Sequence, residues 1–553
     1  MSARVRIVFL GGLGEIGRNC FCLEVDGRLV VVDCGLMFPE ADMPGVDLVL
    51  PDFTFLRDHA DQVDGIVVTH GHEDHVGGLA YLLRDVSAPI YGSPLSLGLA
   101  RNRIEEAGLL GRTKLVPVAD GETRRIGPVD CEFIPVAHSV PQAFAVAYST
   151  PAGTILHTGD FKLDLTPVDG RRTDLARLGE LGRAGVRVLL SDSTNAERPG
   201  FTESESTIGV AMRALFREHT DRRFIIASFA SHLHRVEQLA REAIAAGRRV
   251  AFLGRSMTQN VTLGREMGLL DLPVDRIVDA EDVSRYAPGE VCIICTGSQG
   301  EPMSALALMA SHEHKLFKIS NDDVVVLSAH AIPGNEPSVH RVIDGLHRAG
   351  ALVMHDETSH VHVSGHASRE ELKFVLGIVE PEWFIPVHGE YRHLVHHADL
   401  AEDMGVDPDH VLICEDGDAV TLDRSGLEVE RRAVPAGYQY VDGIAGDIGH
   451  GVLRDRRSLA EEGFVVVIIT IDGTTGELVT EPEIVTRGWV YEAEAEELLG
   501  EAKAAVRAAV TPADHDGTVD FEGLRRSARR ALGRLINERT RRRPAVIPVV
   551  MEV

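Results

Sequence analysis

Short apolar runs that predict buried strands recur along the chain, and polar residues follow several of them directly. The run DGIVV (64–68) predicts one such strand, and VGGLAYLLRDV (76–86) carries apolar residues at helical spacing. The polar stretch THGHEDHVGG (69–78) lies between them. The pattern therefore predicts a junction between a strand and a helix, where a rigid scaffold can hold polar side chains over a cleft.

The middle of the chain shows its own alternation of strands and helices. A helix-like segment, SHLHRVEQLAREAIAAG (231–247), stands among four strand-like runs, which are RRFIIASFA (222–230), RRVAFLG (248–254), GEVCIICTG (289–297) and DDVVVLSAH (322–330). Such an alternation predicts a parallel sheet with flanking helices. From about residue 447 a separate unit is expected, with GFVVVIITID (463–472) as a strand and LRRSARRALGRLINERTRRRP (524–544) as a helix.

Length and composition limit the class of protein. A chain of 553 residues is too long for one core and should divide into about three or four domains. Its hydrophobic content of 44% and a mean hydropathy near zero are those of a soluble globular protein. The sequence shows neither a run of about 18 apolar residues nor a signal-peptide pattern at its start, so we expect a cytoplasmic protein without a membrane segment.

The seven cysteines do not suggest a disulfide framework, because their number is odd and most lie in apolar runs. Cys292 and Cys295 form a CxxC, but we expect them to be core residues of a buried strand rather than a metal or redox pair. The formal net charge of −28 argues against a nucleic-acid partner. Bound metal ions would add positive charge that this sum omits, so the local distribution of charge decides.

The stretch 69–78 concentrates ionisable side chains at one point, because His70, His72, Glu73, Asp74 and His75 fall within six consecutive residues. Neutral imidazoles with carboxylates form the ligand set that zinc and manganese accept, so a metal centre is the first hypothesis. The alternative is a solvated polar loop. The strand and helix predicted on either side favour the metal centre.

A site for two metals needs about seven or eight ligand atoms, so further ligands should follow other strands. Three apolar runs end in this way, and they place His138, His157, Asp160 and His388 at or just beyond strand ends. A histidine at a single strand end is usually a structural residue. The shared form of the three segments predicts that they meet at one edge of a sheet.

A glycine motif near the N-terminus suggests a competing function. Gly12-x-Gly14-x-x-Gly17 follows a predicted strand, and Asp33 ends the run RLVVVD (28–33), as in a dinucleotide-binding oxidoreductase. However, two strand-like runs joined by Asp26-Gly27 predict a hairpin, which leaves no room for the crossover helix of that fold. We expect instead that the glycines let the backbone approach the active site closely.

The motif His70-x-His72-x-Asp74-His75, with His138 and Asp160, resembles the signature of the metallo-β-lactamase superfamily. The resemblance implies an αββα sandwich that carries a dinuclear metal site. It implies one metal held by His70, His72 and His138, a second held by Asp74 and His75, a bridging Asp160, and an Asp33 that steadies the site from behind.

Later segments resemble the β-CASP branch of that superfamily, whose members process nucleic acids. The three segments are LLSDSTNAERPG with Asp192, HVSGHASREE with His366 and PVHGEYRH with His388. Within the branch, FASHLHRV, TGSQGEPMSAL, IPGNEPSVHRVID and GDIGHGVLRDR are similar to the bacterial ribonuclease J family, and the similarity spans residues 10 to about 500. His388 would then complete the second metal site. SAHAIPGNE departs from the family pattern at His330, to which we assign no role.

The resemblance implies an α/β fold class, with an αββα metallo-β-lactamase sandwich, an inserted α/β β-CASP domain and a small α+β C-terminal domain. The expected boundaries are 1–204 and 365–435 for the sandwich, 205–364 for the insertion, 436–446 for a linker and 447–553 for the C-terminal domain.

The activity implied by the resemblance is that of a metal-dependent ribonuclease in RNA maturation and decay. It would combine a 5′-to-3′ exonuclease that favours a 5′-monophosphate with an endonuclease. Water ionised at the metals would leave a 5′-phosphate and a 3′-hydroxyl. Asp74 and Asp160 would act at the metals, His366 would face the scissile phosphate and Asp192 would orient an imidazole. The residues expected to bind substrate are Ser364, His366, Ala367, Ser228, Ser231 and Ser298, although ordinary turn chemistry explains any one serine loop of the insertion equally well.

We expect two divalent metal ions per subunit, with zinc as the bound ion and manganese or magnesium as alternative activating ions. The expected partners are single-stranded RNA, further copies of the chain in a homodimer or homotetramer formed through the C-terminal domain, and RNA-decay proteins such as a helicase or other nucleases. Nine arginines lie between Arg525 and Arg543, beside an apolar stripe made of Leu524, Ala528, Ala531, Leu532, Leu535 and Ile536. For these arginines we favour a solvated face or a subunit contact over RNA contact.

Two other functions compete with the ribonuclease. A small-molecule ester, thioester or lactam hydrolase would share the six ligands from His70 to Asp160, but it would not need the insertion, His366 or His388. A catalytically silent RNA-binding subunit would have lost its ligands, whereas every expected ligand is present in this sequence.

Overall fold

The computed structural model describes residues 4–553 except 41, 333, 444–445, 491–494 and 511–519. The chain forms two compact units, one of Met1–Phe38 with Leu48–Gln439 and one of Pro39–Asp47 with Tyr440–Val553. No described helix is long and apolar enough to cross a membrane. All seven cysteines are buried and free.

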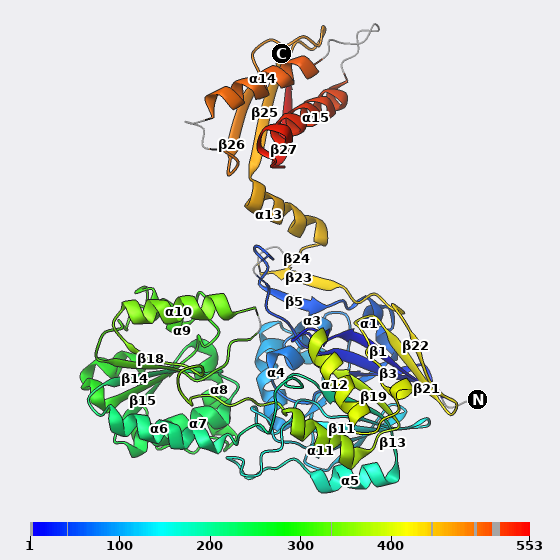
Figure 1. Cartoon of the computed structure of the whole chain (residues 1–553), viewed down its shortest axis with the longest axis vertical. Helices are drawn as coiled ribbons and strands as arrows, with labels where there is room; N and C mark the ends of the chain where they lie inside the picture. Colours follow the sequence, from blue (N-terminus) through cyan, green and yellow to red (C-terminus); the bar gives the residue numbers. More distant parts are fainter. Residues whose placement is uncertain (1–3, 41, 333, 444–445, 491–494, 511–519) are drawn as a thin grey trace. The chain divides into compact units, whose positions relative to one another are not determined.

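Two sheets packed face to face form the core of the larger unit (Figure 1). The first has the order β22 (Gly426–Glu430), β21 (Ala419–Asp423), β1 (Val5–Gly11), β3 (Cys20–Val25), β4 (Arg28–Val32), β6 (Val63–Val67), β7 (Ile90–Gly92) and β8 (Leu115–Pro117). The second has the order β19 (Trp383–Val387), β13 (Val186–Asp192), β12 (Gly153–His157), β11 (Phe144–Thr150), β10 (Val129–Pro135) and β9 (Thr123–Ile126). Apolar side chains of both sheets, such as Phe9 and Leu190, fill the space between them.

Helices cover the outer faces of the two sheets and complete the αββα sandwich. The first sheet is flanked by α3 (Leu79–Leu82) and α4 (Pro94–Glu106), with α1 (Thr54–Asp58) between β5 (Leu48–Pro51) and β6. The second is covered by α5 (Leu175–Ala184), α11 (Arg369–Val379) and α12 (Tyr391–Asp403). The predicted sandwich is therefore confirmed.

Strands β3 and β4 form the predicted hairpin, which excludes the dinucleotide-binding interpretation. The two strands pair antiparallel, and Asp26 and Gly27 both adopt positive φ, at 50° and 72°, as a two-residue hairpin turn requires. The predicted junction between a strand and a helix is present, but the helical segment is divided. Two short helices, α2 (Glu73–Val76) and α3, form instead, and Gly77 and Gly78 between them allow a close approach to Leu36 and to the Gly35 carbonyl.

The insertion contains the predicted parallel sheet. Its order is β15 (Arg249–Leu253), β16 (Val291–Cys295), β14 (Arg223–Ala227), β17 (Asp323–Leu327) and β18 (Leu352–Met354), and every neighbouring pair is parallel. One apolar core joins the sheet to α6 (Ser206–Glu218), α7 (Leu233–Ala245) and α8 (Arg255–Glu266). A second core joins its other face to α9 (Ala305–Ala310) and α10 (Glu336–Arg348) (Figure 1).

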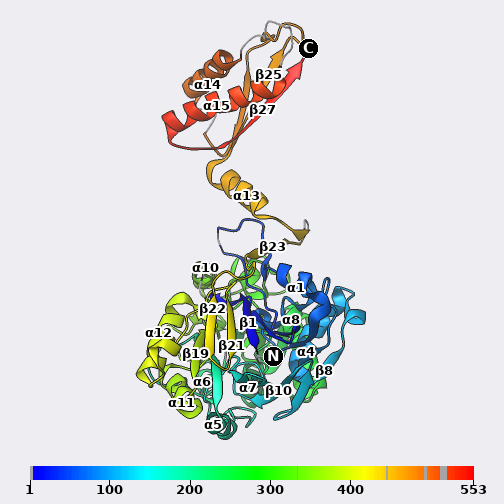
Figure 2. The same cartoon turned by 90° about the vertical axis from the view of Figure 1, so that its right-hand side faces the viewer.

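The smaller unit is an α+β domain built on a three-stranded sheet. The order is β26 (Glu483–Arg487), β25 (Phe464–Ile471) and β27 (Ala545–Glu552), and α14 (Glu496–Ala509) and α15 (Phe521–Thr540) share its apolar core (Figure 2). Helix α13 (His450–Glu462) precedes β25. The stretch predicted as a linker carries β23 (Tyr438–Asp442) and β24 (Gly446–Asp447), while residues 444–445 lie outside the described part.

Candidate metal centre

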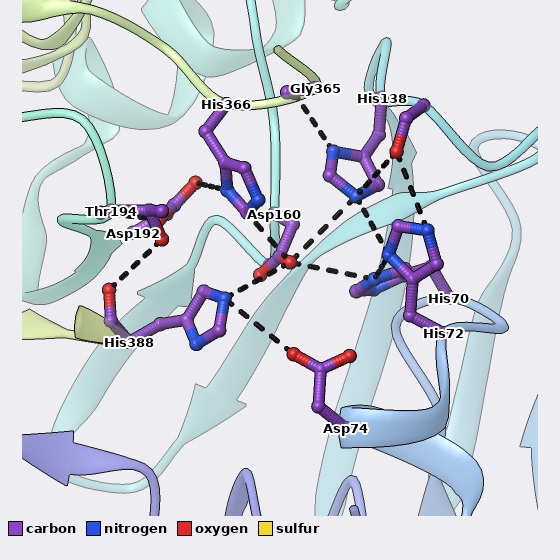
Figure 3. Close-up of polar contacts among 12 residues, drawn as sticks. His70, His72, Asp74, His138, Asp160, Asp192, Thr194, Gly365, His366 and His388 are labelled. Atoms are coloured by element: carbon purple, nitrogen blue, oxygen red, sulfur yellow. Dashed lines mark hydrogen bonds and ion pairs between the residues drawn. The ribbon is translucent and has the colours of Figure 1, made fainter. Parts of the chain in front are cut away.

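The polar residues at the strand ends gather at one edge of the sandwich (Figure 3). His70 and His72 follow β6, and His138 follows β10. Asp160 follows β12, and His388 directly follows β19. Sheet topology therefore brings together residues that are up to 318 positions apart in the sequence.

Three imidazoles and one carboxylate form the first group. The ring nitrogen Nδ1 of His72 lies 3.0 Å from Nε2 of His70 and 3.1 Å from Nε2 of His138. The Oδ2 atom of Asp160 lies 3.5 Å from Nε2 of His70 and 3.8 Å from Nε2 of His138. The three rings therefore direct nitrogens toward one point beside the Asp160 carboxylate (Figure 3).

A second group lies on the other side of the same carboxylate. Nε2 of His75 and Nε2 of His388 are each 3.3 Å from Oδ2 of Asp160. Oδ2 of Asp74 is 3.6 Å from Nε2 of His75 and 3.9 Å from Nε2 of His388. Asp160 is therefore common to both groups, which is the position predicted for a bridging ligand.

The donor set fits divalent metal ions. His70, His75, His138 and Asp160 are buried. Burial lowers the pKa of His70 and His138 well below the ordinary value and lowers that of His72 to about 4, so these rings are neutral and keep a lone pair at neutral pH. Neutral imidazoles with carboxylates suit zinc and similar ions. The fold and the cluster together indicate a site for divalent metal binding.

Hydrogen bonds behind the cluster fix the orientation of the rings. Oδ2 of Asp33 accepts hydrogen bonds from Nδ1 of His75 and from the Thr69 hydroxyl, both at 2.8 Å. The Gly365 carbonyl accepts one from Nδ1 of His138 at 2.9 Å. Both rings are thereby left with Nε2 directed at the cluster, which is the arrangement that orients metal-binding histidines. Asp33 and His388 adopt positive φ, at 55° and 54°, a strain that such sites commonly hold.

Asn19 also touches the second group, and sequence reasoning missed it. Its Nδ2 atom lies 3.1 Å from the Asp74 carbonyl and 3.1 Å from Nε2 of His75. Gly12 adopts a φ of +94°, and a Cβ there would lie 2.4 Å from Oδ1 of Asn19. Strand β2 (Leu13–Gly14) pairs with β20 (Gly389–Glu390), immediately after His388. The glycine segment does approach the site closely, and the only available signal for Asn19 was its place two residues after that motif.

Asp192 and His366 form a third group beside the first two. Nδ1 of His366 donates to Oδ2 of Asp192 at 2.8 Å and lies 4.0 Å from Oδ2 of Asp160. Burial lowers the pKa of His366, but Asp192 outweighs it and, with Asp160, raises the pKa to about 9. The Thr202 hydroxyl donates to the His366 carbonyl at 2.7 Å. The ring is therefore held by Asp192 through Nδ1, and the backbone of His366 is held by Thr202.

The residues expected to bind substrate occupy different places. Ser364 lies two residues from His366, and its hydroxyl accepts hydrogen bonds from Asn195 and from the His366 amide. Ser228, Ser231 and Ser298 follow strands β14 and β16 of the insertion. Ala367 is buried in the core beneath the second sheet, and its N–H donates to the Phe161 carbonyl at 2.6 Å, so the structure does not present it to a ligand.

Two residues singled out in the sequence lie outside these groups. His157 is buried, and its ring meets Phe21 edge-on with centroids 5.1 Å apart, so it is a core residue. His330 forms an ion pair with Asp356 at the end of β17.

Comparison with known proteins assigns a class to most of this architecture. The metallo-beta-lactamase superfamily model matches residues 13–190, and the model of the Ribonuclease J beta-CASP domain matches 221–346. The Zn-dependent metallo-hydrolase RNA specificity domain matches 353–412, and the Ribonuclease J C-terminal domain matches 451–553. Fold and site therefore define a metallo-hydrolase of the metallo-β-lactamase superfamily that carries a β-CASP insertion.

Full-length relatives narrow that class to one family. Ribonuclease J2 of Bacillus subtilis (strain 168) is 40% identical over 554 residues, which cover 100% of this chain and 99% of that protein. Ribonuclease J of Mycobacterium tuberculosis (strain CDC 1551 / Oshkosh) is 41% identical, with coverage of 100% and 98%. The chain belongs to the ribonuclease J family. A crystal structure of a protein of unknown function from Enterococcus faecalis V583 has a TM-score of 0.53 at 14% identity, covers 76% of this chain and 100% of its own, and supports the fold alone.

Proposed function

We propose that this protein is a metal-dependent ribonuclease that degrades single-stranded RNA from the 5′ end, favours a 5′-monophosphate and also cuts internally. The observation that carries the proposal is the Asp160 carboxylate, which lies between two groups of imidazoles with the His366–Asp192 pair beside it. The membership of the ribonuclease J family supports RNA as the substrate.

The proposal assigns the two groups to two divalent ions. His70, His72 and His138 would hold one ion, and Asp74, His75 and His388 would hold the other, with Asp160 shared between them. Zinc is the preferred ion for this donor set, and manganese or magnesium would be activating alternatives. When bound, such ions supply an ionised water near neutral pH and positive charge for the phosphate oxygens.

The neighbouring side chains position the scissile phosphate. His366 donates through Nδ1 to Asp192, which leaves its Nε2–H for a non-bridging phosphate oxygen. The Ser364 hydroxyl accepts hydrogen bonds from Asn195 and from the His366 amide and would contribute a second polar contact. Ser228, Ser231 and Ser298 would hold the RNA backbone at the strand ends of the insertion. The products would be a 5′-phosphate and a 3′-hydroxyl.

Assembly and location complete the proposal. The protein would act in the cytoplasm on maturing and decaying RNA, as a homodimer or homotetramer joined through its C-terminal domain. Other RNA-decay proteins, such as a helicase, would be its partners. The domain boundaries of the sequence analysis remain part of this proposal.

The test compares cleavage of 5′-labelled single-stranded RNA in 5′-monophosphate and 5′-triphosphate forms, with added Mn²⁺ or Zn²⁺. Wild type should release labelled mononucleotide from the monophosphate form, and His72→Ala should lose this activity. His340→Ala, which removes an exposed histidine of α10, is the matched control and should cleave like wild type. If neither RNA is cut while a small ester or thioester is hydrolysed, the small-molecule hydrolase is the correct function.

A further inference from the structure

Helix α15 presents a row of arginines on the side opposite its buried face. Leu524, Ala528, Leu532 and Ile536 pack into the core of the smaller unit. At 100° per residue, Arg526, Arg530 and Arg534 fall within one sector on the opposite side, and Arg541 is the capping residue that directly follows the helix. We call these four residues the arginine stripe. All four are exposed.

The stripe is largely free of neutralising partners. Among the described residues, the side chains of Arg530, Arg534 and Arg541 make no ion pair or hydrogen bond, and Arg526 lies 3.5 Å from an equally exposed Asp520. Other arginines of the same unit do have carboxylate partners. Arg525 pairs with Glu522, Arg539 with Glu501 and Arg507 with Glu481. The positive charge of the stripe is therefore available to an anionic ligand.

This arrangement opposes the stability of the helix. Arginines four residues apart on a helix repel each other. Burial of the opposite face does not require arginine at these positions, because any polar residue would face water equally well. A bound polyanion would turn the repulsion into a favourable interaction.

The chemistry around the stripe favours RNA over a subunit. The core of a protein interface contains large apolar and aromatic side chains even where arginine is enriched, yet no described residue of α15 is an exposed large hydrophobic side chain. Several exposed apolar residues of this unit lie on other elements, among them Val452 and Leu459 on α13 and Ile547, Val549 and Met551 on β27. Those residues suit contact between subunits, whereas guanidinium groups spaced about 6 Å apart along a helix suit successive phosphates.

We propose that the arginine stripe binds the phosphate backbone of single-stranded RNA at a second site, separate from the metal centre. The inference rests on the proposed function, because it concerns the same substrate. The contacts are ionic and carry no base recognition, so binding is independent of sequence and depends strongly on salt. The site retains long RNA while its 5′ end is processed.

The test measures the affinity of the full-length protein for a long and a short single-stranded RNA, over a salt series, with EDTA present to prevent cleavage. The variant is Arg526→Gln/Arg530→Gln/Arg534→Gln. Three lost phosphate contacts should reduce the slope of log K against log salt by about 2 for the long RNA, at roughly 0.7 for each contact. Cleavage of the short RNA after metal is restored should not change, because the metal centre is separate from the stripe.

The matched control is Arg507→Gln/Arg525→Gln/Arg539→Gln, which removes the same charge at arginines that already pair with carboxylates. It should leave the slope close to that of wild type. An unchanged slope in the stripe variant overturns the inference, and a change in molar mass by light scattering without a change in slope assigns the stripe to a subunit contact. If the wild type with added metal does not cleave RNA, the proposed function is refuted. The binding measurement in EDTA is independent of that result, because it does not need catalysis.

Discussion

The Arg235 guanidinium and the Asp160 carboxylate are both buried in the larger unit, but their surroundings differ in one respect. Nη2 of Arg235 donates to Oε2 of Glu205 at 2.6 Å and to the Val363 carbonyl at 3.2 Å, and Nη1 donates to the carbonyl and hydroxyl of Ser328. Nε donates to Oε1 of Glu205. This cluster supplies its own counter-charge and its own acceptors.

The groups around Asp160 do not supply all of their own counter-charges and hydrogen-bond partners. His70, His72 and His138 direct ring nitrogens at one another, and one carboxylate serves two groups of imidazoles. A cation between them would satisfy every nitrogen at once. The difference suggests a general distinction. A buried polar cluster whose groups all have partners within the protein stabilises the fold, whereas a buried cluster whose groups lack such partners marks a ligand site. The following predictions test that distinction.

Loss of the Arg235 guanidinium should give the largest change in stability. Arg235→Met leaves Glu205 buried without its partner, which should lower the free energy of unfolding by about 3–5 kcal/mol. Thermal unfolding of the metal-free protein would measure the loss. The double variant Arg235→Met/Glu205→Gln should recover part of it, because no unpaired charge remains. A single variant as stable as wild type would contradict the structural role of this cluster.

Asp33 tests the opposite case, because its effect should appear only when metal is bound. Asp33→Asn weakens the hold on Nδ1 of His75, and loss of such a contact typically lowers metal affinity by about 10–100-fold. The gain in stability on adding Zn²⁺ should therefore fall by about 1.4–2.7 kcal/mol relative to wild type. Asp26→Asn, at an exposed turn residue that also has positive φ, is the control. Equal gains in both variants would refute the assignment.

The sequence was most informative where the chemistry is local. His70 to His75 lie within six residues, and each later ligand follows an apolar strand, so both the cluster and the sheet edge were predictable. The parallel insertion followed from its alternating pattern in the same way. The assignment of particular ligands depended on family resemblance, because spacing alone does not show which strand ends meet.

Contacts between distant segments were not predictable. Arg235 sits among the apolar residues of an amphipathic helix, and nothing in that pattern indicates that Glu205 and Val363 satisfy it. Asn19 lies 55 residues from Asp74, and only the folded glycine segment brings them together. The break between α2 and α3 arises because Gly77 approaches Leu36, a tertiary contact that helical spacing does not reveal.

The smallest predicted effect is a pH dependence of the protein's stability that arises at the Arg235–Glu205 cluster. His232 is buried next to Glu205, with its Nε2 3.5 Å from Oε2 of that residue, and burial, followed by Arg235, lowers its pKa to about 4. Since the unfolded value is about 6.5, only the unfolded chain binds a proton between these values, so stability falls as the pH falls through this range. His232→Gln should therefore lose less stability between pH 7 and pH 5 than wild type, by on the order of 1 kcal/mol. Thermal unfolding at the two pH values measures the difference, and His340→Gln, at an exposed histidine, is the control. If wild type, His232→Gln and His340→Gln lose the same stability, His232 does not titrate as its burial requires.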